Sequence, residues 1–154
     1  QANQLSKLIN LIKDNTAEPQ RLILEFNESA FTQQTDLALK SLRKLKAFGV
    51  KLALDDYGAG QSSFNFLHSY PFEFIKLDRG FISTLNNNEQ NLSLVKALHD
   101  LGDKFGYRLV AEGIESKEML EKLQTVGCEF GQGYYINRPC KMEKPEFKAR
   151  LAQA

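Results

Sequence analysis

Apolar residues along the chain follow two patterns, longer stretches with helical spacing and short continuous runs. Helical spacing, with apolar residues three and four positions apart, is typical of helices that bury one side. In chain order these stretches are residues 4–14, 35–48 and 91–105, and shorter helices are expected over residues 64–69, 116–124 and 143–151. Gly49, Gly106 and Gly127 follow three of them, as expected where a helix ends.

The short apolar runs are typical of buried strands. They are residues 21–27, 51–56, 74–78, 108–114 and 130–136. Because such runs alternate with helices, the sequence predicts an α/β fold with a parallel sheet and helices outside it. Right-handed crossovers curl this kind of sheet toward a barrel or an open wound sheet. In both cases the functional residues lie at the carboxyl ends of the strands.

Each run contains a polar residue where an apolar one would pack better. These residues are Glu25, Asp55 with Asp56, Lys76, Glu112 and Gln132. A single buried polar residue is usually a structural group satisfied by its neighbours, but one in every strand indicates a common site. For Lys76 the structural alternative is an ion pair with Asp78 or Glu73.

Asp55 and Asp56 precede a glycine-rich loop, residues 58–63, whose serines, Ser62 among them, can cap the next helix. Since side chains alternate along a strand, both aspartates can point the same way only if the strand ends there. A solvated turn is the alternative, because Asp and Gly are common turn residues.

Four carboxylates at one edge of a sheet would repel each other. At ~4 Å and an effective dielectric of ~20, each like-charge pair costs about 4 kcal/mol, so divalent cations or protonation must compensate. Oxygen ligands without clustered His or Cys favour Mg²⁺ or Mn²⁺ over Zn²⁺. Asp55 bridging two such ions would suit phosphate-ester hydrolysis, with Lys76 orienting water or neutralising developing charge.

Composition excludes other classes of function. Lys and Arg number 20 against 19 acidic residues, and this balance argues against a DNA-binding surface. Cys128 and Cys140 match no metal-ligand spacing and are expected to be free thiols in a reducing compartment. No apolar run has the length of a membrane span, and no signal peptide is recognisable.

Five segments together resemble the EAL-domain family of bacterial cyclic di-GMP phosphodiesterases. They read LEFNES, LALDDYGAGQSS, FIKLD, AEGIES and GCEFGQGYYINRP, in the family's order, within about residues 4–139. The resemblance implies a TIM-barrel-like (β/α) fold. It also implies hydrolysis of cyclic di-GMP to linear pGpG with Mg²⁺ or Mn²⁺.

The same resemblance implies a role for each site residue. The implied metal ligands are Glu25, Asp55, Asp56 and Glu112. Lys76 would hold the catalytic water, and Gln132 would lie at the metal-and-phosphate end of the pocket. Glu115 resembles the acid that tethers the loop containing Gly58 and Ser62, which in the family orders the metal site and the dimer interface.

The chain departs from the family pattern at several positions. Asn27 stands where Thr is usual, Tyr57 replaces Phe, and Gln61 replaces the Tyr of the loop. Gln61 exchanges an aromatic anchor for a flexible amide, so loop ordering and dimer coupling are expected to differ. The Glu-Ala-Leu signature and the next metal-binding Asn are absent from the sequence, and both would precede Gln1.

These absences predict that residues 1–154 form a partial EAL domain, with about five of the eight barrel strands and no second domain. We expect the isolated chain to be inactive, and to cover its open sheet edges with another copy, as a homodimer or by edge pairing. An upstream sensory or diguanylate cyclase domain is expected in the parent protein. A bacterial cytoplasmic location, including the cytoplasmic part of a membrane-anchored protein, is expected as well.

Two other functions stay open at this point. One is a catalytically silent cyclic di-GMP receptor or protein-interaction module, although the retained acids weigh against it. The other is an unrelated metal-dependent barrel enzyme, which the order of the motifs makes less favourable.

Overall fold

The computed structural model describes residues 2–16, 18–27, 36–59, 64–86 and 88–139. The helices are α1 (Ala2–Asn15), α2 (Asp36–Ala47), α3 (Phe64–Ser69), α4 (Arg79–Ser83), α5 (Glu89–Phe105) and α6 (Lys117–Thr125). The strands are β1 (Ile23–Asn27), β2 (Lys51–Tyr57), β3 (Phe74–Leu77), β4 (Arg108–Glu112) and β5 (Phe130–Gln132). The predictions for Gln61, Ser62, Cys140 and a closing helix over residues 143–151 lie outside the described residues.

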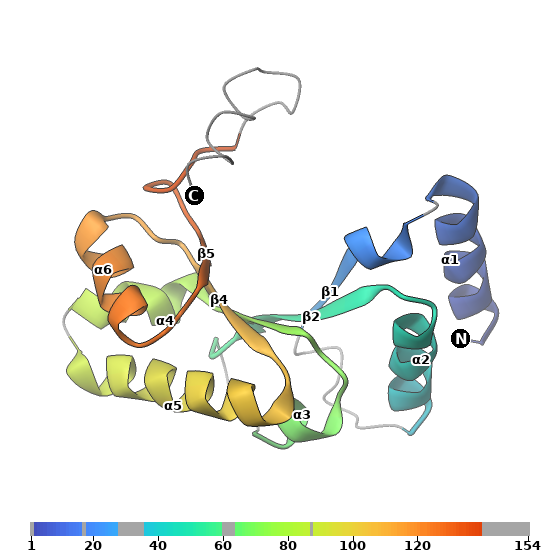
Figure 1. Ribbon diagram of the computed structural model, residues 1–154, viewed down its shortest axis with the longest axis horizontal. Coiled ribbons are helices and arrows are strands. Elements are labelled where there is room, and N and C mark those ends of the chain that lie inside the picture. The colour runs from blue at the N-terminus through green and yellow to red at the C-terminus, as the bar shows by residue number, and fades with distance from the viewer. Residues whose placement is uncertain (1, 17, 28–35, 60–63, 87, 140–154) are drawn as a thin grey trace.

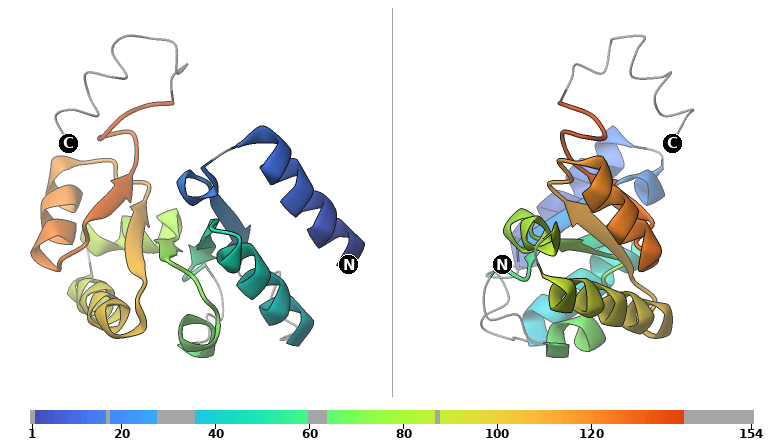
Figure 2. Two further views of the ribbon diagram at one scale, coloured as in Figure 1. Left: turned by 45° about the vertical axis from the view of Figure 1, so that its right-hand side comes forward. Right: turned by 90° about the vertical axis from the view of Figure 1, so that its left-hand side faces the viewer.

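The five strands form one parallel sheet in the order β1-β2-β3-β4-β5. The helices α2, α3 and α5 lie along one face of this sheet (Figures 1 and 2). Sequential strand order with helices on one side is the arrangement of a barrel wall rather than of a doubly wound sheet. The predicted α/β, TIM-barrel-like fold with an incomplete set of strands is therefore confirmed.

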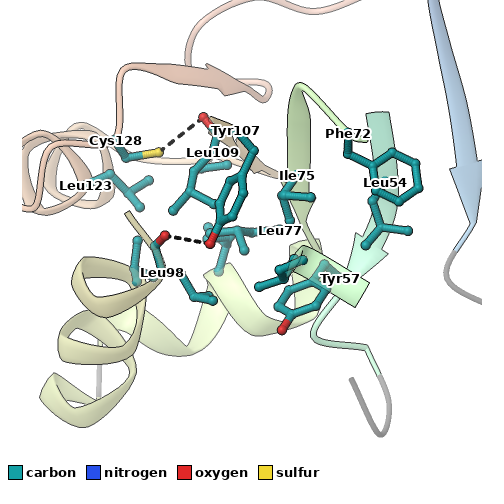
Figure 3. Close-up of a cluster of buried hydrophobic side chains, with 14 of the residues drawn as sticks. Leu54, Tyr57, Phe72, Ile75, Leu77, Leu98, Tyr107, Leu109, Leu123 and Cys128 are labelled. Carbon is teal, nitrogen blue, oxygen red and sulfur yellow. Dashed lines mark hydrogen bonds between the residues drawn. The ribbon is translucent and has the colours of Figure 1, made fainter. Parts of the chain in front are cut away.

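The helix-covered face of the sheet holds the core. Alternate strand residues point toward the helices, namely Leu24, Phe26, Leu52, Leu54, Ile75, Leu77, Leu109 and Ala111. Leu54, Ile75, Leu77 and Leu109 lie in one cluster with Leu98 of α5 and Leu123 of α6 (Figure 3). The hydroxyl of Tyr107 donates to the Leu98 carbonyl oxygen at 2.9 Å, so the polar end of this buried ring is satisfied.

Side chains cap the helices at the positions where they begin. Asn88 accepts hydrogen bonds from the backbone N–H groups of Gln90 and Asn91 at the start of α5. Ser116 accepts from the Met119 N–H at 3.2 Å and caps α6. The described Cys128 is a buried free thiol, and burial raises its pKa, so the group stays protonated.

The strands of the structure end differently from the predicted runs. β1 begins at Ile23 because Pro19–Arg21 forms a 3-10 turn. β4 ends at Glu112, since Gly113 adopts a φ of 72° that a continuing strand does not use. β5 ends at Gln132 rather than at residue 136, because the chain then packs closely against the backbone of Ile114, which follows β4. A Cβ on Gly133 would lie only 2.1 Å from the Ile114 carbonyl oxygen.

A bulge in β2 corrects the prediction that the strand ends at its aspartates. β2 continues to Tyr57, but Leu54 pairs with Ile75 while Tyr57 pairs with Leu77, so β2 contains one extra residue. Asp56 has a φ of 57°, in the left-handed region that Asp tolerates better than most residues. The bulge breaks the alternation that would otherwise place neighbouring side chains on opposite faces.

Helix α4 has no counterpart among the predicted elements. Asp78, which the sequence placed at the end of β3, accepts a hydrogen bond from the Phe81 N–H at 3.0 Å and caps this helix. Five residues are too few to show helical spacing, so the pattern of apolar residues gave no sign of it.

Candidate metal and substrate site

Polar side chains from three other strands surround Lys76 of β3. Its ammonium lies 2.7 Å from Glu112 Oε1, 2.8 Å from Glu25 Oε2 and 2.9 Å from Asp55 Oδ1. The Lys76 side chain is only 10% exposed. The predicted convergence of Glu25, Asp55, Lys76 and Glu112 is present in the structure, and the alternative partners of Lys76 were wrong. Glu73 instead pairs with Lys46 at 3.1 Å, and Asp78 caps α4.

Lys76 is held in its charged form. Burial by itself lowers the pKa of this ammonium, but hydrogen bonds to Glu112, Glu25 and Asp55 outweigh it and raise the pKa above its usual value. With these partners Lys76 donates hydrogen bonds and does not serve as a base. Its positive charge compensates only part of the surrounding negative charge.

Three carboxylates offer a cation a common position. Asp55, Asp56 and Glu112 each present an oxygen atom, and these atoms lie within 4.8 Å of one another. Asp55 Oδ1 is buried, and the Lys76 ammonium, 2.9 Å away, is its charged neighbour. Three carboxylates around one position, with only one ammonium to compensate their charge and oxygen donors only, fit a hard divalent cation such as Mg²⁺ or Mn²⁺.

Glu25 is placed differently from the other predicted ligands. It does not belong to the three-carboxylate group among the described residues, and its described partner is Lys76. Its side chain is 49% exposed, so its carboxylate has room to move toward an ion.

Two amide side chains hold the carboxylates from neighbouring strands. Gln132 Nε2 of β5 donates to Glu112 Oε1 at 2.7 Å, so the predicted Gln132 reaches the site. Asn27 Nδ2 of β1 donates to Asp56 Oδ2 at 2.5 Å, and this contact was missed by sequence reasoning. A usable signal was its spacing, since Asn27 is two positions after Glu25 and shares its face of the strand.

A cleft of about 610 Å³ opens beside the carboxylates. Glu112 and Gln132 are among the residues that line it, together with Arg79, Glu115, Tyr134 and Arg138. Arg79 and Arg138 were not predicted as site residues, because arginines outside the strand ends show no pattern in the sequence. Their two guanidinium groups are matched in number by the carboxylates of Glu112 and Glu115 in the same lining, and Arg79 is paired with Glu115.

Among the described residues, Glu115 pairs with Arg79, whose Nη2 donates a hydrogen bond to Glu115 Oε1 at 2.5 Å. The aliphatic part of the Arg79 side chain packs directly against Gly113. A Cβ added at Gly113 would lie 2.3 Å from Arg79 Cγ. Gly58 faces Phe81 of α4, 3.6 Å from the position that a Cβ would take. The predicted tether between Glu115 and the loop involves residues 60–63, outside the described residues, and stays a prediction.

Among the described residues, no helix combines the length and the hydropathy required to cross a membrane.

Similar proteins share both the sequence and the fold. A bifunctional diguanylate cyclase/cyclic di-GMP phosphodiesterase, MucR of Pseudomonas aeruginosa, is 35% identical over 93% of this chain. The chain spans only 21% of the length of that protein. A MucR phosphodiesterase structure in complex with c-di-GMP superposes with a TM-score of 0.81 at 35% identity, covering 90% of this chain and 56% of that chain.

A further structure has manganese in its complex. BlrP1 of Klebsiella pneumoniae, solved with manganese and cyclic di-GMP, superposes with a TM-score of 0.82 at 28% identity. The match covers 91% of this chain and 36% of that chain. The EAL domain family model matches residues 1–139, which include every site residue described above. The chain belongs to the EAL domain family.

Proposed function

We propose that this chain is part of a cyclic di-GMP phosphodiesterase, which hydrolyses the cyclic dinucleotide to linear pGpG with Mg²⁺ or Mn²⁺. The observation that carries the proposal is the group of Asp55, Asp56 and Glu112 oxygens within 4.8 Å, beside the buried Lys76. The names of the MucR and BlrP1 relatives and their cyclic di-GMP complexes support the choice of substrate.

The balance of charge favours a metal-dependent reaction. Three carboxylates, those of Glu25, Asp55 and Glu112, surround the ammonium of Lys76, and a fourth, that of Asp56, lies close to Asp55 and Glu112. A phosphodiester is an anion and would be repelled by this excess of negative charge. Divalent cations at Asp55, Asp56 and Glu112 would reverse the local charge, and when bound they would supply an activated water and neutralise the phosphate.

The protein's own residues would then position the reacting groups. Lys76, which remains charged, now points its three donors at Glu25, Asp55 and Glu112. If a cation took over one of these carboxylates, the freed donor could bond a water or a phosphate oxygen. Gln132 holds the Glu112 carboxylate in place, as amide partners of metal ligands commonly do. The cleft lined by Arg79 and Arg138 would hold the rest of the anionic dinucleotide.

The test is hydrolysis by the full-length protein. With Mg²⁺ or Mn²⁺ it should convert cyclic di-GMP to linear pGpG, separated and quantified by chromatography. The Asp55→Asn variant should lose this activity, while Asp14→Asn on the exposed side of α1 should retain it. Binding measured by calorimetry without any turnover would contradict the enzyme and favour a silent receptor.

We also propose the finer features of the complete protein. Glu115 tethers the loop that contains Gly58 and Ser62, and the protein forms a homodimer whose coupling is altered by Gln61. The name of the bifunctional relative MucR supports an upstream diguanylate cyclase or sensory domain. Residues 1–154 alone are expected to turn over the substrate slowly or not at all, and rapid turnover by this chain would contradict that expectation.

A further inference from the structure

Asp56 is oriented by a different kind of partner from the other acids of the site. Glu25, Asp55 and Glu112 all contact the ammonium of Lys76. Among ion pairs between described residues, none involves Asp56. Its carboxylate instead accepts a short hydrogen bond from the side-chain amide of Asn27.

The position of this contact follows from the sheet. Asn27 is the last residue of β1 and pairs in register with Asp55, so its side chain lies next to the bulge. Asp56 reaches the same side only because its φ is 57° within that bulge. The amide nitrogen must face Asp56, because the opposite orientation would bring the amide oxygen against a carboxylate oxygen.

The charge of the partner matters for binding a cation. The Lys76 ammonium competes with a divalent ion for the oxygens of Asp55 and Glu112. A neutral amide fixes the Asp56 carboxylate without cancelling its charge, so Asp56 keeps its full attraction for a cation. Hydrogen-bond partners of metal-binding carboxylates typically change metal affinity about 10–100-fold when they are removed.

We propose that Asn27 is a positioning residue that holds Asp56 toward the metal position and thereby sets the metal affinity of the site. The inference rests on the proposed metal-dependent function. It assigns a role to a position where the family resemblance has Thr, a residue that can also donate one hydrogen bond.

Calorimetric titration of the full-length protein with Mn²⁺ tests this role. Asn27→Leu keeps the size and removes the donor, and Asn27→Ala removes it without adding a larger apolar group. Both variants should bind Mn²⁺ about 10–100-fold more weakly than the wild type. Asn27→Thr should recover most of the affinity. Asn15→Leu, which removes an exposed amide donor at the end of α1, is the matched control and should bind normally.

Denaturant unfolding without metal separates positioning from stability. Asn27→Leu should leave the unfolding free energy nearly unchanged while the Mn²⁺ affinity falls. Equal Mn²⁺ affinity in the wild type, Asn27→Leu and Asn27→Ala would overturn the role of Asn27 alone. Absence of Mn²⁺ binding by the wild type would overturn the metal-dependent function together with this inference.

Discussion

The two faces of the parallel sheet are built from the same strands and serve different purposes. Leu54 and Asp55 are neighbours in β2, yet Leu54 is fully buried against the helices while the Asp55 side chain is 27% exposed at the site. In β3, Ile75 is likewise fully buried against the helices, while the next residue, Lys76, points to the site. Alternation along a strand therefore places a residue important for stability beside one important for chemistry.

This difference means that stability and binding can be changed separately. Apolar contacts on the helix-covered face contribute favourable free energy on folding, whereas four carboxylates on the other face repel each other until cations bind. Substitutions on the helix-covered face should lower the unfolding free energy. Substitutions on the face with the carboxylates should instead lower metal affinity.

The largest effect is expected from Leu54→Ala on the buried face. Leu54 has no exposed surface, so its truncation leaves a cavity and should lower the unfolding free energy by about 2–5 kcal/mol. Urea unfolding followed by circular dichroism measures it. Leu11→Ala, at a 61% exposed leucine of α1, is the control and should change stability much less. An equal loss in both variants would contradict the idea that burial of Leu54 on this face stabilises the fold.

Metal addition should produce the next largest effect, on the other face. Mn²⁺ at a concentration about 100 times its dissociation constant should raise the unfolding free energy by about 2.7 kcal/mol. Asp55→Asn should remove most of this gain, because it loses a charged oxygen donor from the three-carboxylate group. Thermal unfolding with Mn²⁺ and with excess chelator checks it, and an equal gain in Asp55→Asn would place the ion elsewhere.

A smaller effect is expected from Gln132→Leu. Its amide holds Glu112 at 2.7 Å, but Lys76 still contacts the same carboxylate, so Mn²⁺ affinity should fall only about tenfold, near 1.4 kcal/mol. Isothermal titration is the measurement. Gln124→Leu on the exposed side of α6 is the matched control, and a Gln132→Leu variant with unchanged affinity would contradict a supporting role.

The smallest effect is expected from Arg79→Ala. Arg79 pairs with Glu115, but its side chain is 65% exposed, and exposed ion pairs contribute at most about 1 kcal/mol. Chemical denaturation should therefore show that the unfolding free energies of Arg79→Ala and the wild type differ by less than this value. A loss of several kcal/mol would mean that its packing across Gly113 stabilises the end of β4.

The sequence predicted those features that depend on local pattern. Runs of buried strand residues and helical spacing gave the order of the elements, and the polar residues within the runs identified most of the site. Lys76 was expected beside the acids of the other strands and lies there in the structure, since apolar neighbours on both sides in β3 mark a charged residue that needs partners.

The features that the sequence did not predict depend on contacts between distant segments. The bulge at Asp56 is defined by the spacing of β3 against β2, which no local pattern in β2 contains. The early end of β5 depends on the approach of Gly133 to the backbone of Ile114. The contact between Asn27 and Asp56 joins residues that are 29 positions apart and requires both the register of β1 and the bulge.

The extra residue in β2 also determines what a one-residue deletion in this strand would do. Deleting a single residue between Leu54 and Tyr57 would restore regular pairing with β3 and leave the apolar core in register. The same deletion would remove one of the paired aspartates from the proposed metal site. One short deletion would therefore remove part of the proposed metal site and leave the core of the domain in register.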